Sequence, residues 1–483
     1  MKKICIFLCL IFVVSACAVS SGCKGDTARS LYDITCTLDG NVLKGCQTVE
    51  FYNHSDNTVS ELKFNLFANA FRKDAKYSPI SAQYISKAYP NGINYGDMVI
   101  NSVVDDDGEI EYTIGGEDQN VLCVPLGEEV FPEERATVTI DFTVNLANVI
   151  ARTGVNSKTV NLANFYPILC ALTDGGFYEC VYYSYGDPFY SDCADYSVTI
   201  TTKSDMIIAA SAAVDSAISG GDTITRTYKL ENARSFAMVA STEFETLTDN
   251  STGVQINYYY YDDSEPLKSM EFAIKSMSEF SDKFGKYCYP TYSVVQTPFV
   301  QGGMEFPALV MISDDLDGLS YGEVIVHETA HQWWQTAVGN NEIEYGFLDE
   351  GLSEYSVVMF YEKYPEYNMT RENLVAASEK TYKTFCSVYD KLYGKVNTVM
   401  VRSLKDFSSE YEYVNIAYIK PCIMYDNLRR SIGDEKFFKA LKKYYADYKY
   451  KNATPDDLVG AFEKTGADTN GYFESFYNGK VII

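Results

Sequence analysis

Two histidines spaced by one helical turn, with a glutamate beside the first, form the clearest chemical motif of this chain. His327 and His331 stand in VIVHETAHQWW, and the chain has only three histidines. On a helix, both imidazoles project from one face and can bind the same zinc ion. Glu328 is rotated by about 100° from His327, which directs it toward a water molecule beside the metal. The motif predicts a zinc hydrolase in which Glu328 is the general base.

A catalytic zinc normally has three protein ligands, so a third ligand must come from a separate element. It should be His, Asp or Glu. The remaining histidine, His54, lies in the turn-like FYNHSDNTV, and we interpret it as a surface residue. The segment YGFLDEGLSEYS follows the motif and predicts a second helix from about residue 349 to 362, with Glu350 at its start.

The pattern HExxH, eighteen residues and then Glu within D-E-G resembles the gluzincin metallopeptidases of the aminopeptidase N family. The resemblance implies one zinc ion with Glu350 as its third ligand. Glu354, one turn further along, could accept a hydrogen bond from a ligand histidine, or could be an ordinary solvated carboxylate. The family also has Q-W after the second histidine, so Trp333 and Trp334 are expected to pack rather than to react.

A second match lies upstream, in QGGMEFP. It is similar to the family's G-x-M-E-N segment and includes Gly302, Gly303, Met304 and Glu305. Glycines allow the backbone of an edge strand to approach a peptide, and Glu305 would bind the peptide's free α-ammonium group. Phe306 replaces the usual Asn, so an endopeptidase or an atypical exopeptidase is the alternative to an aminopeptidase.

The oxyanion formed during peptide hydrolysis needs a hydrogen-bond donor. The family uses the tyrosine of a Y-E-K-G segment for this. In NIAYIKPCIMY, Tyr418 and Lys420 keep that spacing, whereas Ile419 and Pro421 differ from it. Tyr418 is therefore the expected donor, with Tyr413 as the second candidate.

Two domains are expected to position these residues. Short β-rich runs separated by Gly, Asn and Asp clusters predict an all-β, sandwich-like domain over residues 24–248. Helical periodicities then prevail, and residues 249–483 are expected to form an α+β catalytic domain. The resemblance implies a thermolysin-like domain, in a short form without the C-terminal helical domain of larger relatives.

Residues 1–23 predict a signal peptide of the lipoprotein type, with a short basic start and an apolar stretch. VSAC and SSGC resemble a bacterial lipobox, so the lipidated residue would be Cys17 or Cys23. We expect an exported protein, anchored at the cell surface of a bacterium, with plain secretion as the alternative. Outside the cytoplasm disulfides can form. The nearest candidates are Cys36 with Cys46, and the group Cys170, Cys180 and Cys193.

The chain is strongly acidic, with a formal net charge of −26. The negative electrostatic field of such a chain repels nucleic-acid phosphates, so nucleic-acid binding is disfavoured. The expected partners are peptides with a free N-terminus, together with a membrane reached through the lipid anchor. The alternative outside the enzyme class is a surface binding lipoprotein that has lost catalysis.

Overall fold

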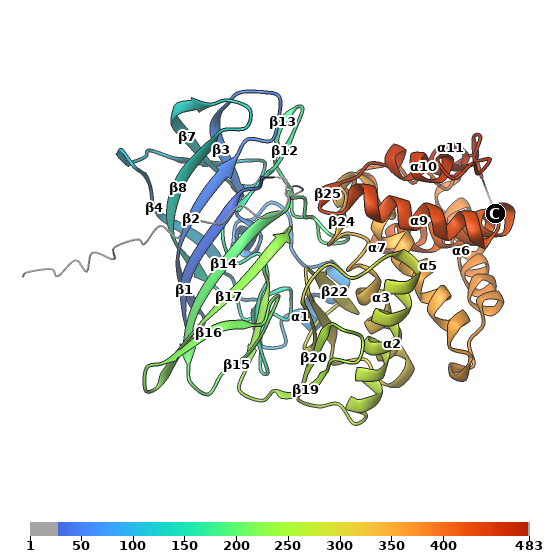
Figure 1. Ribbon diagram of the computed structural model, residues 1–483, viewed down its shortest axis with the longest axis horizontal. Coiled ribbons are helices and arrows are strands. Elements are labelled where there is room, and N and C mark those ends of the chain that lie inside the picture. The colour runs from blue at the N-terminus through green and yellow to red at the C-terminus, as the bar shows by residue number, and fades with distance from the viewer. Residues whose placement is uncertain (1–27, 482–483) are drawn as a thin grey trace, which may run out of the picture.

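The computed structural model describes residues 28–481, which form a β-rich domain next to a helix-rich domain (Figure 1). This order of a sheet-rich domain followed by a mixed one confirms the predicted fold class. The expected signal peptide and lipidated cysteine lie outside the described residues. Within residues 28–481, no helix combines the length and the apolar character needed to cross a membrane.

The largest sheet of the first domain has eight strands in the order β16-β17-β14-β1-β2-β8-β4-β5. Every second residue of β1 is buried, because successive side chains of a strand point to opposite faces. β1 pairs with β14 in parallel, whereas the other neighbours are antiparallel. The strands are β1 (Leu31–Asp39), β2 (Val42–Tyr52), β4 (Asp97–Asp105), β5 (Gly108–Glu109), β8 (Arg135–Asn145), β14 (Ala194–Lys203), β16 (Val214–Ser219) and β17 (Thr223–Ala233).

Three smaller sheets complete the first domain, in the orders β15-β18-β10-β9, β11-β3-β7-β6 and β12-β13. Buried side chains of β3 and β7 share one core with those of the large sheet, as a sandwich-like domain requires. The elements are β3 (Val59–Asn65), η1 (Phe67–Phe71), η2 (Ala82–Tyr84), α1 (Ile85–Ala88), β6 (Thr113–Gly115), β7 (Val121–Val130), β9 (Thr153–Val155), β10 (Val160–Leu162), β11 (Ile168–Leu169), β12 (Ala171–Thr173), β13 (Gly176–Tyr178), β15 (Ile207–Ala210) and β18 (Met238–Ser241).

The second domain begins with a five-stranded sheet in the order β19-β20-β21-β23-β22. β20, β21 and β23 are parallel, and β22 is an antiparallel edge strand. The strands are β19 (Glu245–Asp249), β20 (Gln255–Tyr260), β21 (Thr291–Thr297), β22 (Gly303–Phe306) and β23 (Leu309–Ser313). The boundary expected between residues 248 and 249 falls inside β19. The sheets of the first domain end before Glu245, because β19 already pairs with β20 of the second domain.

Both faces of this sheet are covered. Helices α2 and α3 pack on one face. The other face packs on the first domain, in an apolar cluster that joins residues such as Ala209 and Val239 to Val295 and Met311. All seven residues of β21 are buried as a result. The sheet that carries the candidate site is therefore held between helices α2 and α3 on one face and the first domain on the other.

Helices form the rest of the second domain. They are α2 (Pro266–Phe284), α3 (Gly318–Ala330), α4 (Glu342–Tyr345), α5 (Phe347–Lys363), η3 (Pro365–Tyr367), α6 (Arg371–Tyr393), η4 (Leu404–Asp406), α7 (Glu410–Val414), η5 (Asn415–Ile419), α8 (Lys420–Ile432), α9 (Asp434–Tyr448), α10 (Pro455–Glu463) and α11 (Tyr472–Tyr477), with the short strands β24 (Val338–Gly339) and β25 (Lys451–Asn452). The helix expected from residue 349 to 362 is α5, which starts two residues earlier.

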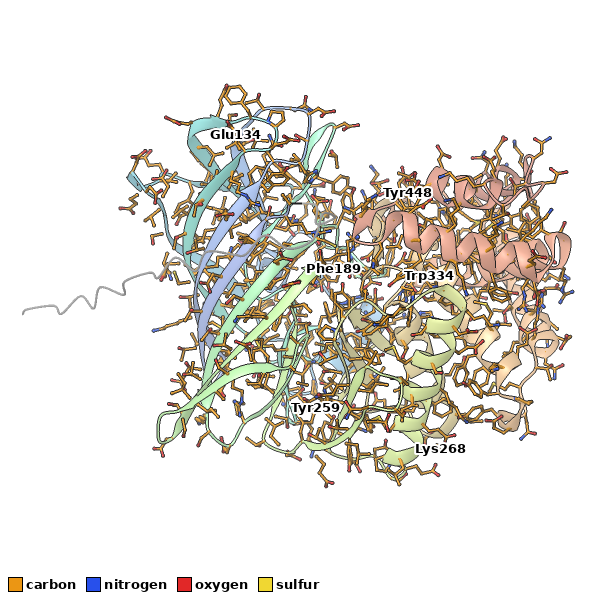
Figure 2. The ribbon with its side chains drawn as sticks, in the orientation of Figure 1. Glu134, Phe189, Tyr259, Lys268, Trp334 and Tyr448 are labelled. Carbon is orange, nitrogen blue, oxygen red and sulfur yellow. The ribbon has the colours of Figure 1, made fainter. Side chains whose placement is uncertain are left out.

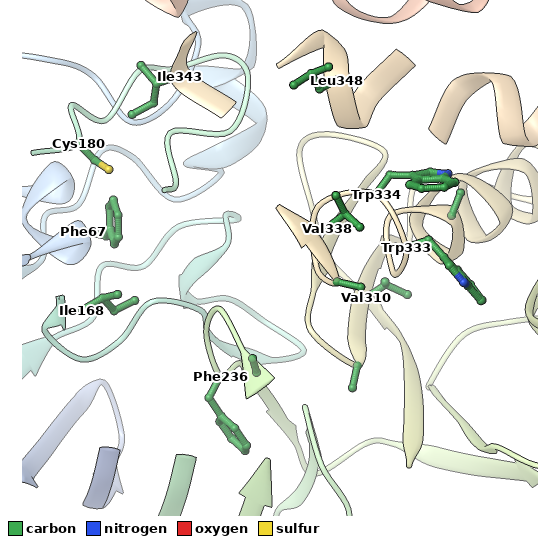
Figure 3. Packing of buried hydrophobic residues seen from close by; sticks show 14 of the residues in the cluster. Phe67, Ile168, Cys180, Phe236, Val310, Trp333, Trp334, Val338, Ile343 and Leu348 are labelled. Carbon is green, nitrogen blue, oxygen red and sulfur yellow. The ribbon is translucent and has the colours of Figure 1, made fainter. Parts of the chain in front are cut away.

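The two tryptophans lie in the core of this domain, near Val310 and Val338 (Figure 3). Trp333 Nε1 donates to the carbonyl oxygen of Gly285 at 2.8 Å. Trp334 Nε1 donates to Ser356 Oγ at 3.3 Å. They therefore attach the end of α3 to neighbouring helices, as their position after the HExxH motif led us to expect.

The nine cysteines of the described residues are all free. The candidate pairs from the sequence are therefore wrong for this structure. Cys36 points into the core, whereas Cys46 on the neighbouring strand is exposed. The two thiols lie on opposite faces of the sheet, where side-chain alternation prevents a bond between them.

Candidate active site

The side chains of His327, His331 and Glu350 converge on one point. The two Nε2 atoms are 3.0 Å apart. Glu350 Oε2 lies 3.3 Å from His327 Nε2 and 3.2 Å from His331 Nε2. The histidines come from the end of α3 and the glutamate from the first turn of α5, two helices that pack together.

The outer nitrogens of both imidazoles have acceptors that orient the rings. His331 Nδ1 lies 3.0 Å from the backbone oxygen of Trp334. His327 Nδ1 lies 3.5 Å from Glu354 Oε2, on the next turn of α5. Such contacts leave each Nε2 free to bind a metal. The structure thus places Glu354 where an orienting acceptor is needed.

The three convergent atoms fit one zinc ion. Ligand atoms around a tetrahedral zinc at 2.0–2.1 Å are separated by roughly 3.3 Å, close to the separations found here. Burial acts to raise the pKa of Glu350, but His331 and His327 outweigh it and lower that pKa to about 2. The carboxylate is therefore ionised at neutral pH, as a ligand must be. Two imidazoles and one carboxylate leave a fourth position for water or substrate.

Glu328 lies beside this centre and is held against the edge strand β22. It is buried, and its Oε2 has no partner among the described residues. Burial raises the pKa of Glu328 to about 7. A Cβ at Gly303 would meet Glu328 Oε1 at 2.4 Å. Gly303 is thus a glycine because the carboxylate occupies the space of a side chain, a reason that the motif alone did not reveal.

Glu305 lies on the same edge strand, 4% exposed, and one of its oxygens comes within 4.8 Å of ligand atoms of Glu328 and His331. Its Oε1 has no partner among the described residues. Burial first, and then the carboxylate of Asp187, raises the pKa of Glu305 well above its usual range. A cation placed beside Glu305 would be strongly favoured, because it would neutralise this buried charge.

Two residues of the first domain, Arg152 and Phe189, pack against this strand, and sequence reasoning missed both. Arg152 Nε donates to Met304 Sδ at 2.9 Å, and its guanidinium forms a buried ion pair with Asp187. Phe189 lies under the Arg152 guanidinium, between the two domains (Figure 2). Neither residue belongs to a local motif, so only the packing of the domains brings them to the site.

Gln332, the residue after the second histidine, attaches the edge strand to the zinc-ligand segment. Its Nε2 donates to the backbone oxygen of Phe306 at 3.1 Å, and its Oε1 accepts from the backbone N–H of Ala308 at 2.9 Å. Ala308 has a φ of 59°, which a β-turn between β22 and β23 requires. The amide of Gln332 therefore fixes the hairpin that carries Glu305.

Tyr418 reaches the metal-binding residues from a single π-helical turn, η5. Its hydroxyl donates to Glu350 Oε1, and its ring stacks on that of His327 at 5.8 Å. Pro421 has no N–H to continue a regular α-helix at this point, and π turns often occur at functional sites. Gly351 makes room for Pro421, since a Cβ there would meet Pro421 Cβ at 2.5 Å. The second candidate, Tyr413, packs edge-on against the ring of Tyr418.

The pocket beside Glu305 is narrow and is lined in part by the first domain. A cavity of about 20 Å³ separates Glu305 from residues of the first domain, including Phe67, Asn164 and Phe189. The first domain therefore forms an end wall behind Glu305.

The five-stranded sheet, the HExxH helix and the glutamate of the following helix define a zinc-metallopeptidase domain of the gluzincin class. Residues 268–476 match the peptidase family M1 domain. The second domain is thus matched over most of its length by the model of peptidase family M1, which supports the resemblance to the aminopeptidase N family.

Two curated aminopeptidases are similar in sequence to this chain, each over a different share of its length. The chain is 22% identical over 417 residues to endoplasmic reticulum aminopeptidase 2 of Bos taurus, covering 78% of this chain and 42% of that protein. It is 26% identical over 233 residues to aminopeptidase N of Lactococcus lactis, covering 43% of this chain and 26% of that protein. The chain thus spans less than half the length of these curated relatives.

A solved structure covers both domains. The M1 zinc metallopeptidase of Deinococcus radiodurans superposes with a TM-score of 0.67 at 15% identity, over 94% of each chain. A mutant of the same enzyme bound to a Tyr-Ser-Ala substrate gives a TM-score of 0.65 at 16% identity. At this level of identity the likeness establishes the two-domain fold.

Proposed function

We propose that this protein is a zinc-dependent aminopeptidase that removes N-terminal residues from peptides. The observation that carries the proposal is the convergence of His327, His331 and Glu350 next to Glu328 and a buried carboxylate, Glu305, on an edge strand. Relatives named as aminopeptidases, and a neighbour bound to a Tyr-Ser-Ala substrate, support it.

The division of roles follows from these positions. A bound zinc ion would polarise the peptide carbonyl and lower the pKa of water. Glu328, buried beside that position, would take the proton from the attacking water and pass it to the leaving amine. The Tyr418 hydroxyl would leave Glu350 and donate its hydrogen bond to the oxyanion. Glu305 would hold the α-ammonium of the peptide, which fixes the distance from its amino end to the bond that breaks.

The general base is tested by Glu328→Gln. The amide keeps the shape of the side chain but cannot accept the proton, so turnover should fall by about 10²–10⁴-fold. Zinc content, measured on the same sample, should stay at one ion per chain. A variant that retains zinc and turns over like the parent protein would contradict the mechanism.

Exopeptidase specificity is tested with matched peptides that carry a free or an N-acetylated first residue. Phe306, the departure from the family pattern, is buried in the apolar cluster between the domains. Its backbone still pairs with β23, so the edge strand persists. We expect cleavage of the free peptide only. Equal cleavage of both would favour the alternative, a zinc endopeptidase. An absence of both zinc and turnover would favour a binding lipoprotein.

We further propose that the protein is exported and lipid-anchored at Cys23 or Cys17. The supporting pattern is the apolar leader with its two lipobox-like segments. Metabolic labelling with a palmitate analogue, compared between Cys17→Ser and Cys23→Ser variants, tests this. Label should disappear in one variant, whereas an unlabelled parent protein recovered from the medium would indicate plain secretion.

A further inference from the structure

A second group of buried carboxylates lies behind the zinc-binding residues. It consists of Glu305 on β22, Glu342 on α4 and Asp349 on α5, and each offers an oxygen within 4.8 Å of the others. Their side chains are 4%, 2% and 2% exposed. Three ionised carboxylates this close together and this deeply buried repel one another unless a positive species lies among them.

Each carboxylate of this group has one oxygen without a hydrogen bond, and the oxygen of Asp349 lies 3.9 Å from His331 Nδ1. Glu305 Oε1, Glu342 Oε2 and Asp349 Oδ2 are all buried without a hydrogen bond among the described residues, as is Gln335 Oε1. Glu305, Glu342 and Gln335 line the cavity of about 20 Å³, which has room for one small species. Gln335 has a φ of 113°, a strained backbone for a residue with a side chain. This strained residue, Gln335, is one of those that line the cavity.

Nearby cationic side chains have other partners. The guanidinium of Arg152 pairs with Asp187. That of Arg234 donates to the backbone oxygens of Gln335, Ser191 and Lys451 rather than to a carboxylate. Amide donors reach the group from Asn340, whose Nδ2 lies 2.9 Å from Asp349 Oδ1, and from the side chain of Gln335 to Glu342. Burial, followed by the Asp349 carboxylate, raises the pKa of Glu342 well above its usual range, which shows how poorly the protein alone balances this charge.

We infer that Glu305, Glu342 and Asp349 bind a hard cation of the size of Ca²⁺, with Gln335 Oε1 as a further ligand. All available donors are oxygens, which Ca²⁺ prefers and which disfavour a second zinc. Ca²⁺ binds oxygens at 2.3–2.6 Å, so ligand atoms up to roughly 5 Å apart can share one ion. Mg²⁺, at 2.0–2.1 Å, requires a tighter group.

This site would be distinct from the zinc centre but linked to it through Glu305. A carboxylate has two oxygens, so one could bind the cation while the other faces the peptide. The cation would hold Glu305 in place and reduce the repulsion at the end wall. The inference stands on the geometry of the group and does not depend on aminopeptidase activity.

Calcium binding to the zinc-loaded full-length protein tests the inference. Protein passed through metal-free buffer is titrated with CaCl₂ in a calorimeter, and its melting temperature is measured in CaCl₂ and in KCl of equal ionic strength. Glu342→Gln removes one ligand charge without changing shape. Glu344→Gln is the matched control on the same short helix, where Glu344 only accepts a hydrogen bond from Tyr178. Zinc content is measured on every sample.

We expect the parent protein and Glu344→Gln to bind one Ca²⁺ and to melt about 5 °C higher in CaCl₂. Glu342→Gln should bind none and show no shift. The inference is wrong if the parent protein binds no Ca²⁺, whatever the variants do, since water or protons then fill the cavity. It is equally wrong if all three proteins respond alike, which would indicate binding to the acidic surface. Because peptide is absent and zinc is counted, neither outcome bears on the proposed hydrolysis.

Discussion

The contact between Gly303 and Glu328 shows how closely the edge strand and the catalytic helix are fitted. A methyl group at position 303 would overlap not only Glu328 Oε1 but also Glu328 Cγ, at 2.6 Å. The general base and the peptide-binding strand therefore share one small volume. At position 302 the nearest atom is Val324 Cγ2 at 3.3 Å, which needs to shift by only a few tenths of an ångström.

These two glycines give a matched pair of substitutions. Gly303→Ala should lower kcat by about 100-fold, because a displacement of the base by about 1 Å disrupts proton transfer. Gly302→Ala should change kcat by only a few-fold. Steady-state kinetics with an aminoacyl reporter, together with zinc analysis, would measure both. Similar losses in the two variants would show that the contact with Glu328 is unimportant.

The hydroxyl of Tyr418 is expected to act only in the transition state. Tyr418→Phe should lower kcat/KM by about 10²–10³-fold, the usual cost of losing one oxyanion donor. Tyr413→Phe is the control, since Tyr413 packs on the ring of Tyr418, whereas the hydroxyl that donates to Glu350 is that of Tyr418. It should lose far less activity. The reverse ranking would assign the oxyanion to Tyr413.

At the scale of elements, Lys420 attaches the start of α8 to the end of the chain. Its Nζ donates to the backbone oxygens of Thr398, at 2.6 Å, and Phe476, at 2.7 Å. Burial lowers the pKa of Lys420 to about 7. A neutral amine still has two N–H groups, which are enough for both carbonyls.

This pKa predicts a specific pH dependence of stability. Above pH 7 Lys420 loses its proton in the folded state, whereas in the unfolded chain it keeps its proton up to about pH 10.4. The free energy of unfolding should therefore rise with pH between these two values. Below pH 7 Lys420 is charged in both states and adds no slope. Melting temperatures from pH 6 to 9 should rise more steeply in the parent protein than in Lys420→Met. Parallel curves would refute the assignment.

The sequence predicts the parts of this site that are local in the chain. His327, His331 and Glu350 follow from helical spacing and the family pattern, and the glycines of QGGMEFP indicate an edge strand. The role of Gln332 depends on the hairpin of β22 and β23, which lies one helix earlier in the chain. The role of Asp187 depends on how the first domain packs against the second. Such contacts leave no periodicity, so no local pattern could have revealed them. The π turn of Tyr418 likewise precedes Pro421, whose ring occupies space left by Gly351 on another helix.

At the scale of the molecule, Arg234 is the main polar link between the domains. It follows β17 and donates to the backbone oxygens of Gln335 at 2.8 Å and Lys451 at 2.5 Å, both in the second domain. A Cβ at Gly339 would meet Arg234 Cζ at 2.0 Å, so the strand β24 is shaped around the guanidinium. The end wall of the site depends on this attachment.

Loss of this link should weaken the whole protein. Arg234→Met leaves several buried carbonyls without donors, which should cost about 3 kcal/mol. Arg226→Met is the control, because Arg226 bonds to Thr202 and Met206 within the first domain. Thermal unfolding would compare them. A melting temperature for Arg234→Met equal to that of the control would show that apolar packing alone holds the domains together.

The end wall formed by Phe67, Asn164 and Phe189 has a consequence for how long a peptide survives. Beyond Glu305 the first domain lines the narrow pocket, so under the proposed function a peptide held there would have no chain on the far side of its first residue. Degradation would then start at one end and proceed in order. A single acetyl or pyroglutamyl cap would protect every bond behind it, so the lifetime of a peptide would depend on its first residue rather than on its length.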